Sequence, residues 1–143
     1  MFRTCAIVLA LAVTLGGVVR AQSAGVWFTV TGHQDDPAVD TVQVDPLPID
    51  AKGDQRVMRI RVSRATERRN WEGVPYRSYV ARVLIDCKER KARYLQGEFH
   101  LQPLWRGTPH TITDYSKPPV RQMLFLDAQP NPTQRIIRAA CGG

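Results

Sequence analysis

The sequence predicts an α+β, mainly β domain: an antiparallel sheet of five to six strands with one short C-terminal helix tied on by a disulfide. Three observations predict this fold. Apolar and polar residues alternate repeatedly between residues 55 and 101, as in strands with one buried and one wet face. The last residues change to a helical spacing of apolar positions. Two cysteines, Cys87 and Cys141, fall on the buried faces of a strand and of that helix.

A leader opens the chain of 143 residues. Arg3 precedes an uncharged apolar run of 15 residues, Cys5 to Val19, and this layout is typical of a secretory signal peptide. The run is shorter than the roughly 20 residues of a membrane-spanning helix. We expect cleavage between Ala21 and Gln22, with an uncleaved anchor as the alternative. Residues 22–143 would then be a single exported domain with a net charge of +5, from 18 basic and 13 acidic residues.

Strands are expected where β-branched and aromatic residues gather or alternate with polar ones. The clearest is 55–64, where Met58, Ile60 and Val62 share one face. The expected strands are 26–31, 40–45, 55–64, 76–87, 92–101 and 123–127. Residues 46–54, 65–75 and 102–122 are rich in turn-forming or polar residues and are expected to be connections.

The C-terminal helix is expected to start after Asn131, a favoured capping residue, with Pro132 at its first position. Ile137 and Cys141 then lie on its apolar stripe. Gly142 follows the last turn, where glycine is favoured.

Cys87 and Cys141 are the cysteines that remain after removal of the leader. An even pair in an exported protein favours a disulfide, which would close a loop of 55 residues and hold a helix too short to persist alone. A catalytic thiol and a zinc ligand are the alternatives. Zinc has little support because the sequence contains no Cys-x-x-Cys or His-x-x-x-His spacing.

The sequence carries no nucleophile elbow, phosphate loop or dinucleotide fingerprint. We therefore expect no enzyme, no catalytic residue, no metal and no cofactor. A small hydrolase that uses His33 or His110 with Asp114 is the alternative from a different functional class.

Arginines interleaved with aromatic residues form the candidate binding surface, a composition enriched at interfaces. A merely solvated strand face is the alternative. The candidate residues are Arg59, Arg61, Arg68, Arg69, Trp71, Tyr76, Arg77 and Arg82. The positive charge favours an acidic protein or polyanionic partner, while export argues against nucleic acid. Edge strands could pair two copies into a homodimer, and the sequence does not decide this.

The segment "YRSYVARVLIDCKERKARYLQGEFH", the tryptophan that follows it and the ending "RIIRAAC" resemble the surface-adhesin protein E family of Gram-negative bacteria. The positions that carry the resemblance are Arg77, Ser78, Cys87, Phe99, Trp105 and Cys141. The resemblance implies a small sheet, a C-terminal helix joined to it by the cysteine pair, and a non-enzymatic role. The family's founding member looks like a lipid-anchored adhesin for host matrix proteins and a haem binder, but this sequence has no cysteine at the end of its leader for such an anchor.

These observations predict an exported, non-enzymatic binding module of the bacterial envelope, in the periplasm or on the outer surface. Its ligand would be a host matrix protein or another surface molecule. The alternative in the same broad class is a periplasmic envelope-maintenance or inhibitor protein whose basic face meets a polyanion or an acidic partner.

Overall fold

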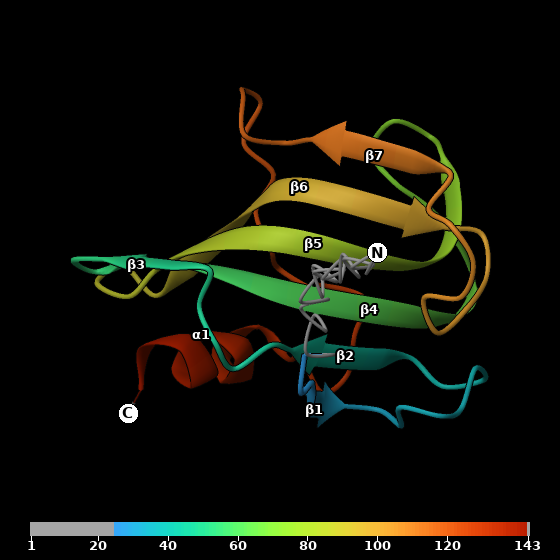
Figure 1. Cartoon of the computed structure of the whole chain (residues 1–143), viewed down its shortest axis with the longest axis horizontal. Coiled ribbons are helices and arrows are strands. Elements are labelled where there is room, and N and C mark those ends of the chain that lie inside the picture. The colour runs from blue at the N-terminus through green and yellow to red at the C-terminus, as the bar shows by residue number, and fades with distance from the viewer. Residues whose placement is uncertain (1–24, 143) are drawn as a thin grey trace, which may run out of the picture.

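The computed structural model describes residues 25–142, which form a seven-stranded antiparallel sheet and one helix (Figure 1). The expected leader and its cleavage site at Ala21 and Gln22 lie outside the described residues. The strands lie in the order β1-β2-β4-β5-β6-β7, and β3 pairs with the start of β4. Their bounds are β1 Phe28–Thr31, β2 Thr41–Val44, β3 Asp50–Lys52, β4 Gln55–Arg69, β5 Pro75–Asp86, β6 Lys91–His100 and β7 Thr111–Asp114, and the helix α1 spans Thr133–Cys141.

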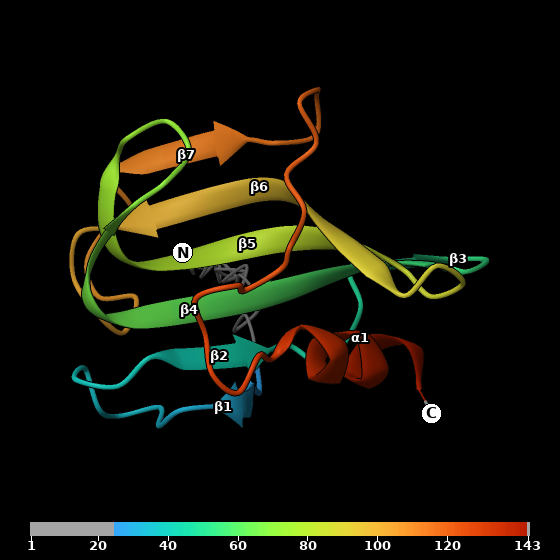
Figure 2. The same ribbon diagram turned by 180° about the vertical axis from the view of Figure 1, so that it is seen from behind.

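The two faces of the sheet differ because side chains alternate along each strand. Met58, Ile60 and Val62 of β4 are at most 1% exposed, as the sequence predicts. They share the covered face with Val83 and Ile85 of β5. Figure 2 shows why this face is buried: the chain after β7 crosses it and continues into α1. We call the opposite side the open face.

The hairpin of β4 and β5 is the centre of the sheet and is longer than expected. The sequence prediction ended the first strand at residue 64, but β4 continues to Arg69, and only 70–74 connects it to β5. The pairing is irregular between Ser63 and Arg68, which lets the end of the hairpin bend. The Asp40 carboxylate accepts the Ala65 backbone N–H at 2.7 Å within this irregular stretch. Figure 2 shows the hairpin end curling toward β7.

Two short strands lie in segments that were expected to be loops, which raises the strand number to seven. β3 pairs with β4, and β7 pairs with β6. The expected strand 123–127 is wrong. Met123 and Phe125 are buried and Leu124 and Leu126 are exposed, so the residues alternate as in a strand. The segment nevertheless crosses the covered face, and its neighbour Gln122 forms only one isolated bridge to β6.

The helix α1 begins at Thr133, one residue later than expected, and Pro132 is its N-cap. The Asn131 side-chain oxygen accepts the Thr133 backbone N–H at 2.9 Å, so Asn131 satisfies one of the free donors at this helix end. Gly142 closes the helix with a positive φ of 77°, and its N–H donates to the Arg138 carbonyl at 2.8 Å. This confirms the predicted glycine stop.

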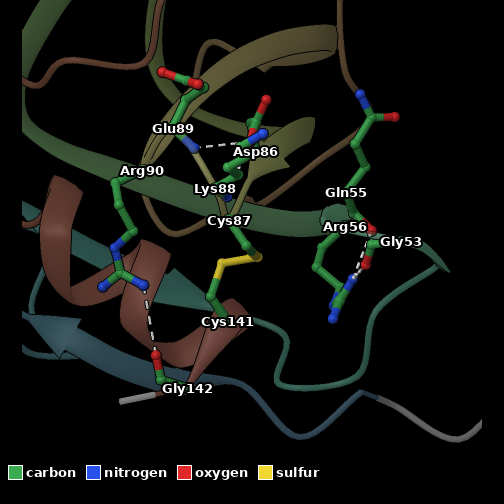
Figure 3. Close-up of a disulfide and its surroundings, with 10 residues drawn as sticks. All are labelled: Gly53, Gln55, Arg56, Asp86, Cys87, Lys88, Glu89, Arg90, Cys141 and Gly142. Atoms are coloured by element: carbon green, nitrogen blue, oxygen red, sulfur yellow. Dashed lines mark hydrogen bonds between the residues drawn. A yellow bond between two sulfur atoms is a disulfide. The ribbon is translucent and has the colours of Figure 1, made fainter.

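The disulfide between Cys87 and Cys141 joins the turn after β5 to the last turn of α1 (Figure 3). Their Cα atoms lie 5.6 Å apart. The pair confirms the predicted disulfide and with it the predicted fold class. Among residues 25–142, no helix is long and apolar enough to cross a membrane.

Candidate functional site

The structure divides the predicted binding surface into two separate sites. Arg59, Arg61 and Arg82 lie on the open face, while Arg69, Trp71 and Tyr76 line a pocket on the covered face. Arg68 lies beside that pocket and pairs with Asp127, which lines it. Arg77 joins neither site: its guanidinium donates to the carbonyls of Arg64 and Pro37, at 3.0 and 3.1 Å, so it ties the bent hairpin to the β1–β2 loop.

Arg61 is the best-defined residue of the open face because its guanidinium lies between two indole rings. The guanidinium carbon is 4.4 Å from the centroid of Trp27 and 3.9 Å from that of Trp105. Its Nε donates to the Gln43 side-chain oxygen at 2.6 Å, and Gln43 in turn donates to the Thr29 hydroxyl at 2.8 Å. The cation–π contacts with both indole rings and these hydrogen bonds fix the direction of the guanidinium.

The neighbours of Arg61 add positive charge. Arg59 precedes it by two residues on the same face, and Arg82 lies directly opposite Arg59 in the register. We call Arg59, Arg61 and Arg82, with Trp27 and Trp105, the open-face arginine cluster. No carboxylate of residues 25–142 lies within 4.0 Å of these three arginines. Partial burial and the charge of Arg59 lower the pKa of Arg61 to about 10.

The loop that follows β6 holds Trp105 in place. The buried Ser78 hydroxyl donates to the Gln102 carbonyl at 2.6 Å and accepts the Trp105 backbone N–H at 3.0 Å. The Ser63 hydroxyl accepts the Leu104 N–H at 3.0 Å. The Trp105 indole N–H donates to carbonyls of β4 and β5 at 3.1 Å. Leu104 and Trp105 both have a positive φ, 55° and 57°, which costs about 1–2 kcal/mol for each such residue. These contacts stabilise the strained loop.

A pocket of about 520 Å³ is lined by side chains of β4, β5 and β6 and by residues of the segment 120–127 in the chain after β7. All four tyrosines of the chain line it, together with Trp71, Phe99 and Phe125. The rings of the tyrosines, Trp71 and Phe99 contact one another mainly edge to face, with centroids about 5.3–6.5 Å apart. We call this the aromatic pocket. The tyrosines are Tyr76, Tyr79, Tyr94 and Tyr115.

Arg64 is the buried cation of the aromatic pocket. It is only 6% exposed and pairs with Asp40 at 3.3 Å and with Asp127 at 3.4 Å. Arg68 shares Asp127 at 3.5 Å. Two carboxylates therefore serve two guanidinium groups. The Nε atom of Arg64 is buried and has no partner among the described residues.

Sequence reasoning missed Trp27 and most of the aromatic pocket. Trp27 immediately precedes β1, and only the pairing of β1 with β2 and of β2 with β4 brings it to Arg61. The tyrosines are spread over 40 residues, Tyr76 to Tyr115, with no common spacing. The one available signal was the concentration of aromatic residues in the segments that become β5 and β6.

The hydrolase alternative gains no support from the geometry. His110 and Asp114 stand at opposite ends of β7, about 13 Å apart at roughly 3.3 Å for each strand residue. His33 lies in the loop between β1 and β2, at the far edge of the sheet from β7 (Figure 1). Residues 25–142 also contain no group of three or more His, Cys, Asp or Glu side chains that could hold a metal ion.

Comparison with known proteins agrees with this fold. A family model described as surface-adhesin protein E matches residues 27–142, nearly all of the chain that the structure describes. No curated protein and no solved structure matches the chain. The matched range includes both cysteines of the disulfide, the open-face arginine cluster and the aromatic pocket. The chain therefore belongs to the surface-adhesin protein E family.

Proposed function

We propose that the protein is a non-enzymatic surface adhesin that binds a linear polyanion, of the class of sulfated glycans, through the open-face arginine cluster. Membership of the family points to a binding protein and to the cell surface. The observation that carries the choice of ligand is Arg61, a guanidinium fixed between Trp27 and Trp105 beside two further arginines that form no ion pair within 4.0 Å among the described residues.

The charge of the cluster suits sulfate and carboxylate groups. A guanidinium presents a rigid fork of N–H donors that can hold two oxygens of such a group at once. Residues two apart on one strand are about 6.6 Å apart, and neighbouring strands are about 4.8 Å apart. Arg59, Arg61 and Arg82 therefore offer positive charge at intervals of a few ångströms, which a polymer with closely repeated anions can match.

The structure around the cluster also favours binding. Arg59 and Arg82 lie directly opposite each other and neither forms an ion pair within 4.0 Å among the described residues, so their charges repel. Acidic side chains line the hollows beside Arg82 without pairing with it, among them Glu98 and Asp114. The Trp105 loop keeps two residues in a strained backbone conformation. Strain of this kind is found preferentially at functional sites. An anion on the cluster would relieve the repulsion, and the fixed position of Arg61 would lower the entropy lost on binding.

Binding to heparin tests the proposal. The triple variant Arg59→Gln, Arg61→Gln and Arg82→Gln should bind heparin at least about tenfold more weakly at physiological salt, because each charge-assisted hydrogen bond contributes roughly 1.5–3 kcal/mol. Binding by the unchanged protein should weaken as added salt shortens the Debye length.

The control is a second triple variant, Lys52→Gln, Lys88→Gln and Arg138→Gln, which removes the same number of charges. These three residues are exposed and lie outside the cluster. Equal loss of binding in both triple variants would show that net charge alone attracts heparin, and the proposal would then be wrong. A preference for an acidic protein over heparin that still depends on the three arginines would overturn the choice of ligand.

Surface display is tested separately. Protease treatment of intact cells should remove the protein if it is an adhesin on the outer surface. Full protection in intact cells, with cleavage only after the outer membrane is opened, would instead favour the alternative of a periplasmic envelope-maintenance or inhibitor protein.

A further inference from the structure

We infer that the aromatic pocket binds a single-chain anionic amphiphile, of which a medium- or long-chain fatty acid is the simplest form. The inference does not depend on the proposed function, because the pocket lies on the covered face and the open-face arginine cluster lies on the other side of the sheet.

The space and its walls suit an apolar chain. A volume of about 520 Å³ falls within the roughly 300–1,000 Å³ of small-molecule sites. The wall formed by the sheet carries the rings of Tyr79, Tyr94 and Phe99, and the chain after β7 contributes Phe125. These aromatic side chains give the pocket an apolar wall, against which an apolar chain would lose contact with water.

Two buried N–H donors of residues that line the pocket have no hydrogen-bond partner among the described residues, and a ligand oxygen could supply one. Arg64 and Asn70 both line the pocket, and the Nε of Arg64 and the Nδ2 of Asn70 are buried and have no partner in the part of the chain that the structure describes. Buried N–H groups are almost always paired in folded proteins. Both residues lie near the C-terminal end of β4, one within the strand and one just beyond it. A carboxylate has only acceptors and could serve both donors.

The charges of the lining favour an anion over a cation. Arg64, Arg69 and Arg121 line the pocket against the single carboxylate of Asp127, which is already paired with Arg64 and Arg68. The Arg121 guanidinium lies 5.2 Å from the ring centroid of Trp71, so it covers this ring and adds positive charge to the pocket.

Large apolar side chains exposed to solvent belong to the same lining. Leu126 is 79% exposed, Trp71 50% and Leu124 48%. Their exposure beside a hollow of this size indicates an opening through which an apolar molecule can enter. A ligand with a chain would cover this rim, while its carboxylate would reach the donors at the end of β4.

Calorimetric titration with laurate, below its micelle concentration, tests the inference. We expect saturable binding of one laurate per chain and at least about tenfold weaker binding in the double variant Leu124→Ser and Leu126→Ser, which loses apolar contact area at the rim. The matched control is Leu47→Ser with Leu101→Ser, whose leucines are 74% and 56% exposed and lie outside the pocket. Equal loss in both double variants, or no saturable binding, would overturn the inference.

Charge selection is tested with dodecyltrimethylammonium, a cation with a chain of similar length. It should bind at least about tenfold more weakly than laurate, and Arg121→Gln should narrow that difference while Arg138→Gln leaves it unchanged. Equal binding of the two amphiphiles would rule out an anion site.

The triple open-face variant Arg59→Gln, Arg61→Gln and Arg82→Gln separates this inference from the proposed function. It should bind laurate as the unchanged protein does even where heparin binding is lost. If laurate binding falls together with heparin binding, the aromatic pocket is not the laurate site and the inference is wrong.

Discussion

Arg59 of β4 and Arg82 of β5 lie directly opposite each other on the open face, so the central strand pair of the sheet places two like charges side by side. Like charges in directly opposed positions destabilise a sheet. The fold thus retains an unfavourable pair at the site where we propose that an anion binds. Stability and binding should therefore respond in opposite directions when one of these charges is removed.

Arg82→Gln should raise the free energy of unfolding by about 0.2–1 kcal/mol, because it removes the repulsion across the strand pair but keeps a polar side chain on the open face. Urea denaturation at low salt measures this change. The gain should shrink at 1 M salt, where the Debye length is about 3 Å. The exposed helix residue Arg138, changed to Gln, is the control and should shift stability by less than about 0.5 kcal/mol. A destabilised Arg82→Gln protein would contradict the repulsion argument.

Ser78→Ala should destabilise the protein by about 1–3 kcal/mol, because it leaves the Gln102 carbonyl and the Trp105 N–H without their buried partner. The near-ultraviolet circular dichroism of the indole should change with it, since this hydroxyl helps to hold the Trp105 loop. Ser116→Ala is a matched control: its hydroxyl also forms a hydrogen bond, to Asp114, but the residue is exposed. Equal effects of the two substitutions would show that the Ser78 contacts do not hold the loop.

The predicted fold depended on local periodicity and was correct where periodicity decides the structure. The alternation around Met58 and Ile60 identified the buried face of β4, and the phases of Cys87 and Cys141 indicated the disulfide. The face on which a residue lies follows from the geometry of its own strand or helix, so the sequence pattern is sufficient to predict it. The sequence also located three arginines of the open face correctly, because residues two apart on one strand share a face.

The features that the sequence did not predict depend on contacts between segments that are far apart in the chain, which no local pattern encodes. The bend of the hairpin between Ser63 and Arg68 separates Arg68 and Trp71 from Arg61, so one predicted surface became two. Alternation in 123–127 reflects packing against the covered face, because the segment pairs with β6 only at its start, through the bridge of Gln122 and the Met123 N–H that donates to the Ala92 carbonyl. Trp27 reaches Arg61 only across two strand pairings.

The disulfide between Cys87 and Cys141 predicts that native, oxidised protein contains no titratable thiol among residues 25–142. Reduction should lower the melting temperature, because the bond closes a long loop whose restriction in the unfolded chain is worth about 4 kcal/mol in the chain-entropy model. The double variant Cys87→Ser and Cys141→Ser should melt at the temperature of the reduced protein. Two thiols reacting in native protein that was made in an oxidising compartment would contradict the bond.

The hydroxyls of Tyr79 and Tyr94 lie 2.8 Å apart and share a hydrogen bond inside the aromatic pocket. Burial is the main reason that the pKa of each is raised above the ordinary value of about 10. Burial likewise raises the pKa of Tyr76 and of Tyr115, whose hydroxyl also donates to the Glu72 carboxylate at 2.7 Å. Every tyrosine of the chain is therefore harder to ionise in the folded protein than in the unfolded one.

The raised pKa values of all four tyrosines predict how the stability of the protein changes at alkaline pH. Tyrosinate absorbance should stay low through pH 10 in the native protein and rise near pH 10 in urea. Folded pKa values above the unfolded ones give stability that is complete below about pH 10 and is lost as the pH rises toward the folded values, by up to about 1.4 kcal/mol per pH unit for each tyrosine. Tyr79→Phe should reduce the slope of this decline by up to about 1.4 kcal/mol per pH unit, because one tyrosine fewer loses its proton on unfolding. Tyrosinate absorbance at pH 10 in a protein that keeps its near-ultraviolet circular dichroism would show that the tyrosines are not shielded in the pocket.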